Sequence, residues 1–226
     1  DENGEIKGGH SNIPGLEVLE SADAMIIFAR FLALPDEQMK HIDAYLNRGG
    51  PVMGLRTSTH AFRYGNKVSA YYRYDFRSKV EGYESGFGHQ ILGQSWVGHY
   101  GQNHRQSTRI TIIPENAKHP ILRGVKDVHV QCGGYNAEPA DEWDILTMAQ
   151  PLMSMKFDGA PDPNKPPMAS EWTREYTGAN GAKGRVFTSL YGASEDFLNP
   201  GYRRMLVNAS YWLLGFEDQI KANAPI

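Results

Sequence analysis

A strand–helix–strand pattern near the start of the chain is the feature that most constrains its fold. Residues 24–28 (Ala-Met-Ile-Ile-Phe) form a short apolar run, which is typical of a strand covered on both faces. Residues 35–48 predict an amphipathic helix that begins at a proline, carries acids in its first turn and ends before Gly49-Gly50. Residues 51–55 predict the next strand. Because the joins are short, the two strands should be parallel, with a right-handed crossover.

The remainder of the chain predicts a mixed arrangement of strands and helices. Residues 56–107 are rich in aromatic residues, glycine and histidine, and predict a short helix near 61–64 followed by a long irregular insert at about 65–107. Further elements are expected as strands at 109–113, 128–131 and 145–148, a single helical turn at 119–124, a hairpin of 167–172 and 184–189, and a helix at 200–214. This order predicts an α/β fold with an antiparallel addition.

Composition and charge exclude several classes of protein. The 226 residues carry 23 Lys and Arg against 26 Asp and Glu, a net charge of −3, without a basic cluster. Neither nucleic acid nor a membrane is therefore expected as a partner, and no apolar stretch is long enough to span a bilayer. A single cysteine excludes an internal disulfide. We expect a soluble protein, cytoplasmic or periplasmic, with no cofactor; the sequence leaves a homo-oligomer open.

Polar side chains follow the predicted strands, which is where parallel sheets bind ligands. Arg30 follows the first strand, and residues 56–60 (Arg-Thr-Ser-Thr-His) follow the second. His60 suits a general base near neutral pH, and Arg56 suits an oxyanion or a carboxylate. The alternative is that the hydroxyls cap a helix at Ala61 and that Arg56 pairs with a carboxylate of the protein.

Several short motifs along the chain together resemble the ThuA-like (trehalose utilisation) family. The motifs are Asp36-Glu37-Gln38 with Gly49-Gly50, Gly54-Leu55, Gly98-His99, His119-Pro120-Ile121 with Gly124, Asp141-Glu142, and Gly184-Arg185-Val186-Phe187 with the tryptophan-bearing final helix. The likeness spans residues 16–216. It implies a flavodoxin-like (class I glutamine amidotransferase-like) fold, with a mostly parallel sheet flanked by helices, and a small-molecule carbohydrate as partner.

The chain departs from that superfamily at its catalytic positions. Amidotransferases place a nucleophilic cysteine in the turn after the strand that corresponds to 51–55, where this chain has Arg56. The superfamily's histidine turn corresponds to residues 191–195, which hold no histidine. Cys132 follows a different strand and is expected to be buried or idle. Glutamine amidotransferase activity is therefore not expected, because acyl transfer needs a nucleophile within reach of a base.

The resemblance and the strand-end rule together predict a sugar site at residues 56–60, covered by the loop 98–104. The expected catalytic residues are His60, His99 and Glu142. The expected substrate-binding residues are Arg30, Arg56, Thr57, Thr59, Trp96, Tyr100, His104 and Tyr191. Aromatic side chains with polar tips stack on sugar rings, although those of the insert are equally typical of a satellite core.

Three functional hypotheses stay open. The first is an enzyme of carbohydrate (trehalose or related disaccharide) utilisation that performs hydrolysis, isomerisation or elimination on an oxidised sugar. Hydrolysis would need two carboxyl groups, from Glu142, Glu171 or Glu195. The second is a non-catalytic sugar-binding or interaction module. The third is a metal-dependent enzyme that uses histidines without a recognisable ligand spacing, namely His60, His89, His99 and His104.

The position of the first predicted strand bears on domain organisation. The chain enters with loop-like sequence and reaches that strand only at residue 24. In the flavodoxin-like plan this strand would be the third, and a sheet cannot leave its centre unpaired. We therefore expect a single domain over residues 1–226 that lacks an N-terminal strand–helix–strand portion, or else a different strand order.

Overall fold

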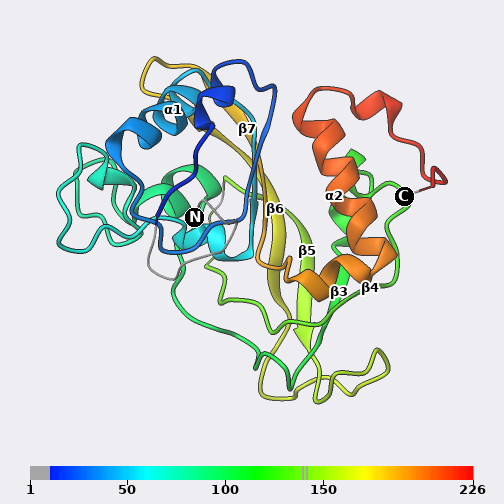
Figure 1. Ribbon diagram of the computed structural model, residues 1–226. Coiled ribbons are helices and arrows are strands. Elements are labelled where there is room, and N and C mark those ends of the chain that lie inside the picture. The colour runs from blue at the N-terminus through cyan, green and yellow to red at the C-terminus, as the bar shows by residue number, and fades with distance from the viewer. Residues whose placement is uncertain (1–10, 139, 141, 226) are drawn as a thin grey trace.

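The computed structural model describes residues 11–138, 140 and 142–225. The opening loop 1–10 and Asp141 of the acidic motif lie outside the described residues. The described part forms one strongly curled seven-stranded sheet, in the order β1-β2-β7-β6-β5-β3-β4 (Figure 1). The strands are β1 (Met25–Ile27), β2 (Val52–Leu55), β3 (Thr108–Ile112), β4 (Val128–Val130), β5 (Asp144–Pro151), β6 (Met168–Thr177) and β7 (Lys183–Ser189). Two α-helices accompany them, α1 (Asp36–Asn47) and α2 (Pro200–Leu213).

The predicted strand–helix–strand unit is confirmed, but the expectation of a mostly parallel sheet is wrong. β1 pairs with β2, and β2 with β7, in parallel. The pairs β7–β6, β6–β5, β5–β3 and β3–β4 are all antiparallel. Parallel neighbours need a crossover, usually a helix, and the described residues between β3 and β7 contain only short helical turns. The predicted hairpin of β6 and β7 is one of these antiparallel pairs.

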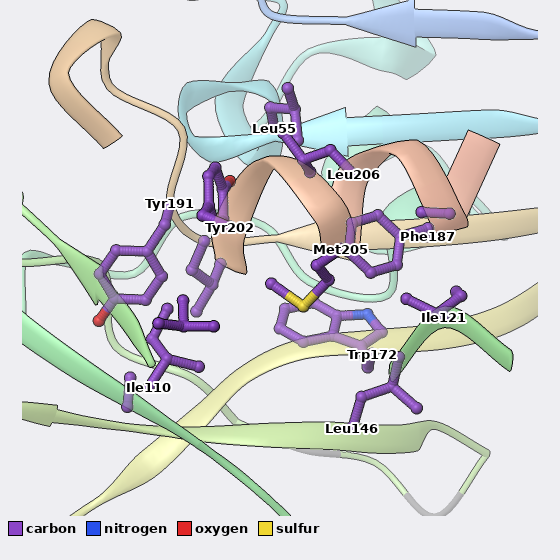
Figure 2. Close-up of a cluster of buried hydrophobic side chains, with 14 of the residues drawn as sticks. Leu55, Ile110, Ile121, Leu146, Trp172, Phe187, Tyr191, Tyr202, Met205 and Leu206 are labelled. Carbon is purple, nitrogen blue, oxygen red and sulfur yellow. The ribbon is translucent and has the colours of Figure 1, made fainter. Parts of the chain in front are cut away.

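Helices α1 and α2 cover opposite faces of the parallel part of the sheet. Val52 and Val186 pack in the cluster that contains α1, whereas their neighbours Met53 and Phe187 pack in the cluster that contains α2. This is the alternation expected along strands that are buried on both faces. The second cluster surrounds Trp172 of β6 (Figure 2). No helix among the described residues is long and apolar enough to cross a membrane.

The insert begins differently from the expected helix near 61–64. A 3-10 turn, Arg56–His60, comes directly after β2. The following backbone then extends, because Leu32 forms a parallel bridge with Phe62 and its amide donates to the carbonyl of Ala61 at 2.7 Å. Further along, a π-helical turn, Gly88–Leu92, ends at a carbonyl that accepts hydrogen bonds from the buried Trp172 and Thr188 side chains. These two hydrogen bonds from the core hold the end of the turn, and with it the segment between Leu92 and Trp96.

Candidate functional site

The carboxyl ends of β1 and β2 are tied together at one place. Ser58, in the turn after β2, donates its hydroxyl to the carbonyl of Ile27, the last residue of β1, at 2.7 Å. The amide of Phe31 donates to the carbonyl of His60 at 3.0 Å. Arg30 and His60, which the sequence places after separate strands, are therefore held at the same edge of the sheet.

Both strand exits use backbone conformations that favour glycine, although neither residue is one. Phe31 has a φ of 52° and Arg56 a φ of 46°. Such left-handed residues cost free energy and persist where the surrounding structure requires them, often at functional sites. Arg56 is the first residue after β2, so this strand ends in a sharp turn that carries a guanidinium.

Five rings pack together beyond these strand ends, and we call Phe31, His60, Trp96, His99 and Tyr135 the aromatic cluster. His60 lies at its centre: its ring centroid is 4.9 Å from that of Phe31, 5.1 Å from Trp96 and 5.5 Å from Tyr135. His99 lies 5.3 Å from Tyr135 and 5.7 Å from Trp96. Tyr135 follows β4 at the far edge of the sheet order, so the curl of the sheet brings it back to the end of β2.

His60 is neutral at pH 7 in this environment. Only 3% of its surface is exposed. Burial, then the positive charge of Arg30, then His99 and Arg56, lower its pKa to about 4. Its Nδ1 lies 3.2 Å from the hydroxyl of Thr59, which itself donates to the carbonyl of Arg56 at 3.3 Å. With that hydroxyl proton engaged, the oxygen of Thr59 is free to accept from Nδ1–H, and in this tautomer Nε2 keeps its lone pair. Within the described residues, Nε2 has no hydrogen-bond partner.

A small cavity adjoins the aromatic cluster, and we call it the strand-end cavity. Its volume is about 220 Å³, and Arg56 contributes to both features: its guanidinium lines the cavity and lies 5.3 Å from the ring centroid of Tyr135. The Nη1 atom of Arg56 is buried and has no hydrogen-bond partner in the described structure. The other lining residues are Asn103, His104, Gln131, Cys132, Met155, Ala193 and Glu195. A buried guanidinium nitrogen without a protein partner needs an acceptor from a ligand, an ion or a water molecule.

The floor of the strand-end cavity is organised by Asp196, which is fully buried. Its carboxylate accepts hydrogen bonds from the amides of Gln131 at 2.6 Å, Gly192 at 2.9 Å and Ala193 at 2.8 Å. The thiol of Cys132 also donates to it, at 2.9 Å. Burial first, and then the charge of Asp196, raise the pKa of Cys132 to about 12, so this cysteine stays a thiol and does not act as a nucleophile.

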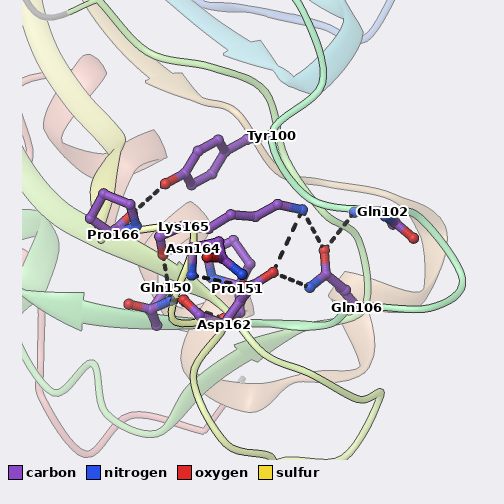
Figure 3. A network of polar contacts seen from close by, with 9 residues as sticks. All are labelled: Tyr100, Gln102, Gln106, Gln150, Pro151, Asp162, Asn164, Lys165 and Pro166. Carbon is purple, nitrogen blue, oxygen red and sulfur yellow. Dashed lines mark hydrogen bonds and ion pairs between the residues drawn. The ribbon is translucent and has the colours of Figure 1, made fainter.

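The loop that carries His99 and His104 is anchored by a polar network (Figure 3). Gln106 donates to the carboxylate of Asp162 at 2.8 Å and accepts from Lys165 at 2.7 Å. The hydroxyl of Tyr100 donates to the carbonyl of Pro166 at 2.6 Å. These hydrogen bonds hold the backbone of the loop that carries the two histidines. The Tyr100 hydroxyl donates to the protein itself and so belongs to this network.

Six of the residues expected at the site come together there. Arg30, His60, Trp96 and His99 meet in or beside the aromatic cluster, and Arg56 and His104 line the strand-end cavity. The hydroxyl of Thr59 contacts Nδ1 of His60. Thr57 is half-buried in the same turn and makes no side-chain hydrogen bond within the described residues.

The remaining expected residues lie elsewhere. Tyr191 is fully buried in the core, where burial raises its pKa well above 10 (Figure 2). Glu142 faces a different cavity of about 570 Å³, and its exposed carboxylate lies 4.0 Å from Arg174. That cavity is larger, but it is an open groove among long charged side chains and holds no strained strand exit. The structure therefore places Glu142 in a different cavity, away from the aromatic cluster that contains His60 and His99.

The described carboxylates and histidines were also considered for glycoside hydrolysis and for metal binding. Glu171 is completely buried and accepts hydrogen bonds from the hydroxyls of Thr147, Ser170 and Ser189. It therefore cannot pair with Glu195 across a sugar. Within the part of the chain that the structure describes, no three His, Cys, Asp or Glu side chains are grouped to hold a metal ion.

Sequence reasoning missed three residues of the site: Phe31, Tyr135 and Asp196. Tyr135 ends the run Cys132-Gly133-Gly134-Tyr135 directly after a predicted strand, so the strand-end rule could have included it. Gly133 is needed there, because a Cβ at this position would lie 2.3 Å from the backbone of Gly101 in the facing loop. Nothing in the sequence around Asp196 indicates that its carboxylate binds three amides.

Comparisons with known proteins agree with the resemblance noted in the sequence. A family model described as ThuA, trehalose utilisation, matches residues 11–213. No curated protein matches the chain. A ThuA-like protein from Bacteroides uniformis is 15% identical, with a TM-score of 0.54 over 88% of this chain and 71% of that one. Another from Parabacteroides merdae is 14% identical, with a TM-score of 0.53 over 92% and 74%. At such identities these structures support the fold alone.

Proposed function

The chain belongs to the ThuA family of trehalose utilisation, and on that premise we propose that it binds and acts on a sugar derivative at the ends of β1 and β2. The observation that carries the proposal is the buried, unpartnered Nη1 of Arg56 beside the faces of the aromatic cluster. In this proposal the parallel strands β1, β2 and β7 correspond to part of a flavodoxin-like sheet, whose ligands lie beyond the strand ends.

The dimensions of the site favour a small sugar. Ligand pockets for drug-sized molecules are about 300–1,000 Å³, and the strand-end cavity, at about 220 Å³, is smaller. It suits one sugar ring, either a monosaccharide or the terminal unit of a disaccharide. Arg56 and Asn103, which line the cavity, offer donors to the oxygens of the sugar, and the side chain of Met155 offers an apolar contact.

The chemistry of the site favours proton transfer next to a carbonyl. Neutral His60 has a free lone pair on Nε2, and the neighbouring Arg56 and Arg30 carry positive charge. His60 is not among the residues that line the strand-end cavity, so the proposed step requires an oxidised (keto) sugar to reach past Arg56 to the aromatic cluster. There Nε2 would take a proton from the carbon beside the carbonyl. The electron pair of the broken C–H bond would move to the carbonyl oxygen, where the guanidinium of Arg56 stabilises the resulting enolate. Return of the proton to the opposite face of the same carbon isomerises the sugar to its epimer. Alternatively, the electron pair of the enolate re-forms the carbonyl and expels a β-substituent with its bonding pair, which completes an elimination.

A second candidate is a sugar-binding module without catalysis. It is favoured by the Cys132 thiol, whose pKa of about 12 keeps it unreactive, and by an arginine in the turn where the superfamily's nucleophile was expected. The two candidates share the ligand and the site, and they differ only in the role of His60.

We expect ligand-induced stabilisation in a thermal-shift panel of monosaccharides, disaccharides and their keto forms. A sugar at 100 times its Kd should stabilise the protein by about 2.7 kcal/mol, which raises the Tm of a domain of this size by about 5–10 °C. If no member of the panel raises the Tm, the site does not bind sugars and the proposal fails.

His60→Asn then separates the two candidates. If His60 is the base, this variant should bind a keto sugar within a few-fold of the wild type, yet lose the exchange of the sugar's C–H for deuterium followed by NMR in D2O. His89→Asn, an exposed histidine of the same insert, is the matched control and should leave exchange unchanged. A wild type that binds the keto sugar without exchanging any proton would identify a binding module.

A further inference from the structure

We infer that the sugar bound at the strand-end cavity carries a negative charge, as a carboxylate or a phosphate, and that Arg56, assisted by Arg30, recognises it. This inference rests on the proposed function and deepens it by stating the chemical class of the ligand. The overall charge of the chain is −3, so the positive character of the site is local and is not an effect of composition.

First, Arg56 lacks a counter-charge among the described residues. Its Nη1 is buried without a hydrogen-bond partner, and no ion pair within the described residues involves Arg56 or Arg30. Arg56 as a whole is half-buried, but this nitrogen is shielded from water, and a buried donor left without an acceptor costs free energy. An oxyanion on the ligand supplies both the missing acceptor and the missing charge, and the planar guanidinium fits a carboxylate or a phosphate well.

The second argument is the sign of the charges that face the aromatic cluster. Arg30, His99 and Arg56 all depress the pKa of His60, and Arg56 and Arg30 both oppose the rise that burial causes in the pKa of Tyr135. Two guanidinium groups, Arg56 at the cavity and Arg30 at Phe31, thus act on the same rings, and no carboxylate is among the causes of the pKa shifts at His60 or Tyr135.

The third argument is a set of cations on the outer side of the cluster. The guanidinium groups of Arg30 and Arg63 lie 5.2 Å and 5.4 Å from the ring centroid of Phe31. Arg77 lies 4.9 Å from the ring of Phe76, which is itself 5.2 Å from Phe31. These exposed arginines raise the local potential, which attracts anions to the site and should make binding sensitive to salt.

Two carboxylates adjoin the cavity, and each could pair with Arg56 in place of a ligand. Asp196 is already occupied by three amides and a thiol. Glu195 is exposed at the rim; its pKa is lowered by its own amide and by Ser194, and then by His104 and Arg56. Glu195 is therefore a competitor for the same cations. Its neutral variant, Glu195→Gln, should bind an anionic sugar more tightly than the wild type.

The test is a calorimetric comparison of D-glucuronate, D-glucose 6-phosphate and D-glucose. We expect the wild type to bind at least one anionic sugar about 10–100-fold more tightly than glucose, the range typical of a charge-assisted hydrogen bond. Arg56→Gln should weaken binding of the anionic sugars much more than binding of glucose, which loses only a neutral donor, so most of the preference should disappear; Arg30→Gln should weaken the preference in the same direction. Lys118→Gln, an exposed change of equal charge, is the matched control and should have no effect.

Each other outcome is decisive. Equal affinities for glucose and for both anionic sugars would overturn the inference and leave the proposed function standing. Binding of none of the three, nor of any neutral sugar of the thermal-shift panel, would remove the proposed function itself. Inorganic phosphate or acetate that binds as tightly as the anionic sugars would also overturn the inference, because the site would then recognise an ion and not a sugar. The phosphate and carboxylate arms identify which anionic group the site prefers.

Discussion

Replacing Asp196 by alanine is expected to lower the free energy of unfolding by about 3–5 kcal/mol. The carboxylate is fully buried and is the shared acceptor for the amides of Gln131, Gly192 and Ala193. Its removal leaves these donors unpaired, and an unpaired buried donor costs about 1–3 kcal/mol. Urea unfolding followed by circular dichroism measures the change.

The neighbouring residue provides the control for this prediction. Glu195→Ala removes an exposed carboxylate and should change stability by no more than about 0.5 kcal/mol. Asp196→Asn, which keeps one acceptor oxygen, should fall between the two. If Asp196→Ala proved as stable as Glu195→Ala, the amides would have other partners and our description of the cavity floor would be incorrect.

Trp172→Ala is expected to have an effect of similar or greater size, about 3–5 kcal/mol. Trp172 has no exposed surface and stacks on Trp143, with ring centroids 4.4 Å apart and an interplanar angle of 8°. Its Nε1 also donates to the carbonyl of Leu92 at 2.8 Å, at the end of the π-helical turn before Trp96. The substitution therefore creates a cavity and releases the segment that leads into the site. For a domain of this size we expect the Tm to fall by roughly 10 °C.

Trp172→Phe separates the two contributions, because it keeps most of the ring packing and loses only the hydrogen bond to Leu92. Its cost should be clearly smaller than that of the alanine variant. Trp212→Ala, at a partly exposed position on α2, is the matched tryptophan control and should cost less than Trp172→Ala. A Trp172→Ala protein that unfolds at the same denaturant concentration as the Trp212→Ala protein would contradict the assignment of the core.

The local elements could be predicted from the sequence because each has its own short-range pattern. The apolar run before Pro35, the acids of the first helical turn and the Gly49-Gly50 stop mark the strand–helix–strand unit, and the structure confirms β1, α1 and β2 within one residue. The glycine-rich segment between β6 and β7 marks their hairpin in the same way. The strand order could not be predicted, because pairing between distant strands leaves no local signature, and the antiparallel majority of the sheet was therefore missed.

The residues of the candidate site were likewise predictable only where they follow strands whose pairing was predicted. Arg30, Arg56 and His60 follow the two strands whose parallel pairing was predicted, so the rule of strand ends places them correctly. Glu142 precedes β5, which is separated from β2 by β7 and β6 in the sheet, and therefore lies too far away to face His60. Tyr135 follows β4 at the opposite edge and reaches His60 only through the curl of the sheet, a property that no window of sequence contains.

A crystal structure of the protein soaked with D-glucuronate would show directly which side chains hold the anionic group. We expect the carboxylate on the Nη1 side of Arg56 and the sugar ring in the strand-end cavity, beside Asn103 and Met155. A glucuronate bound instead in the groove between Glu142 and Arg174, with Arg56 still unpaired, would contradict the account.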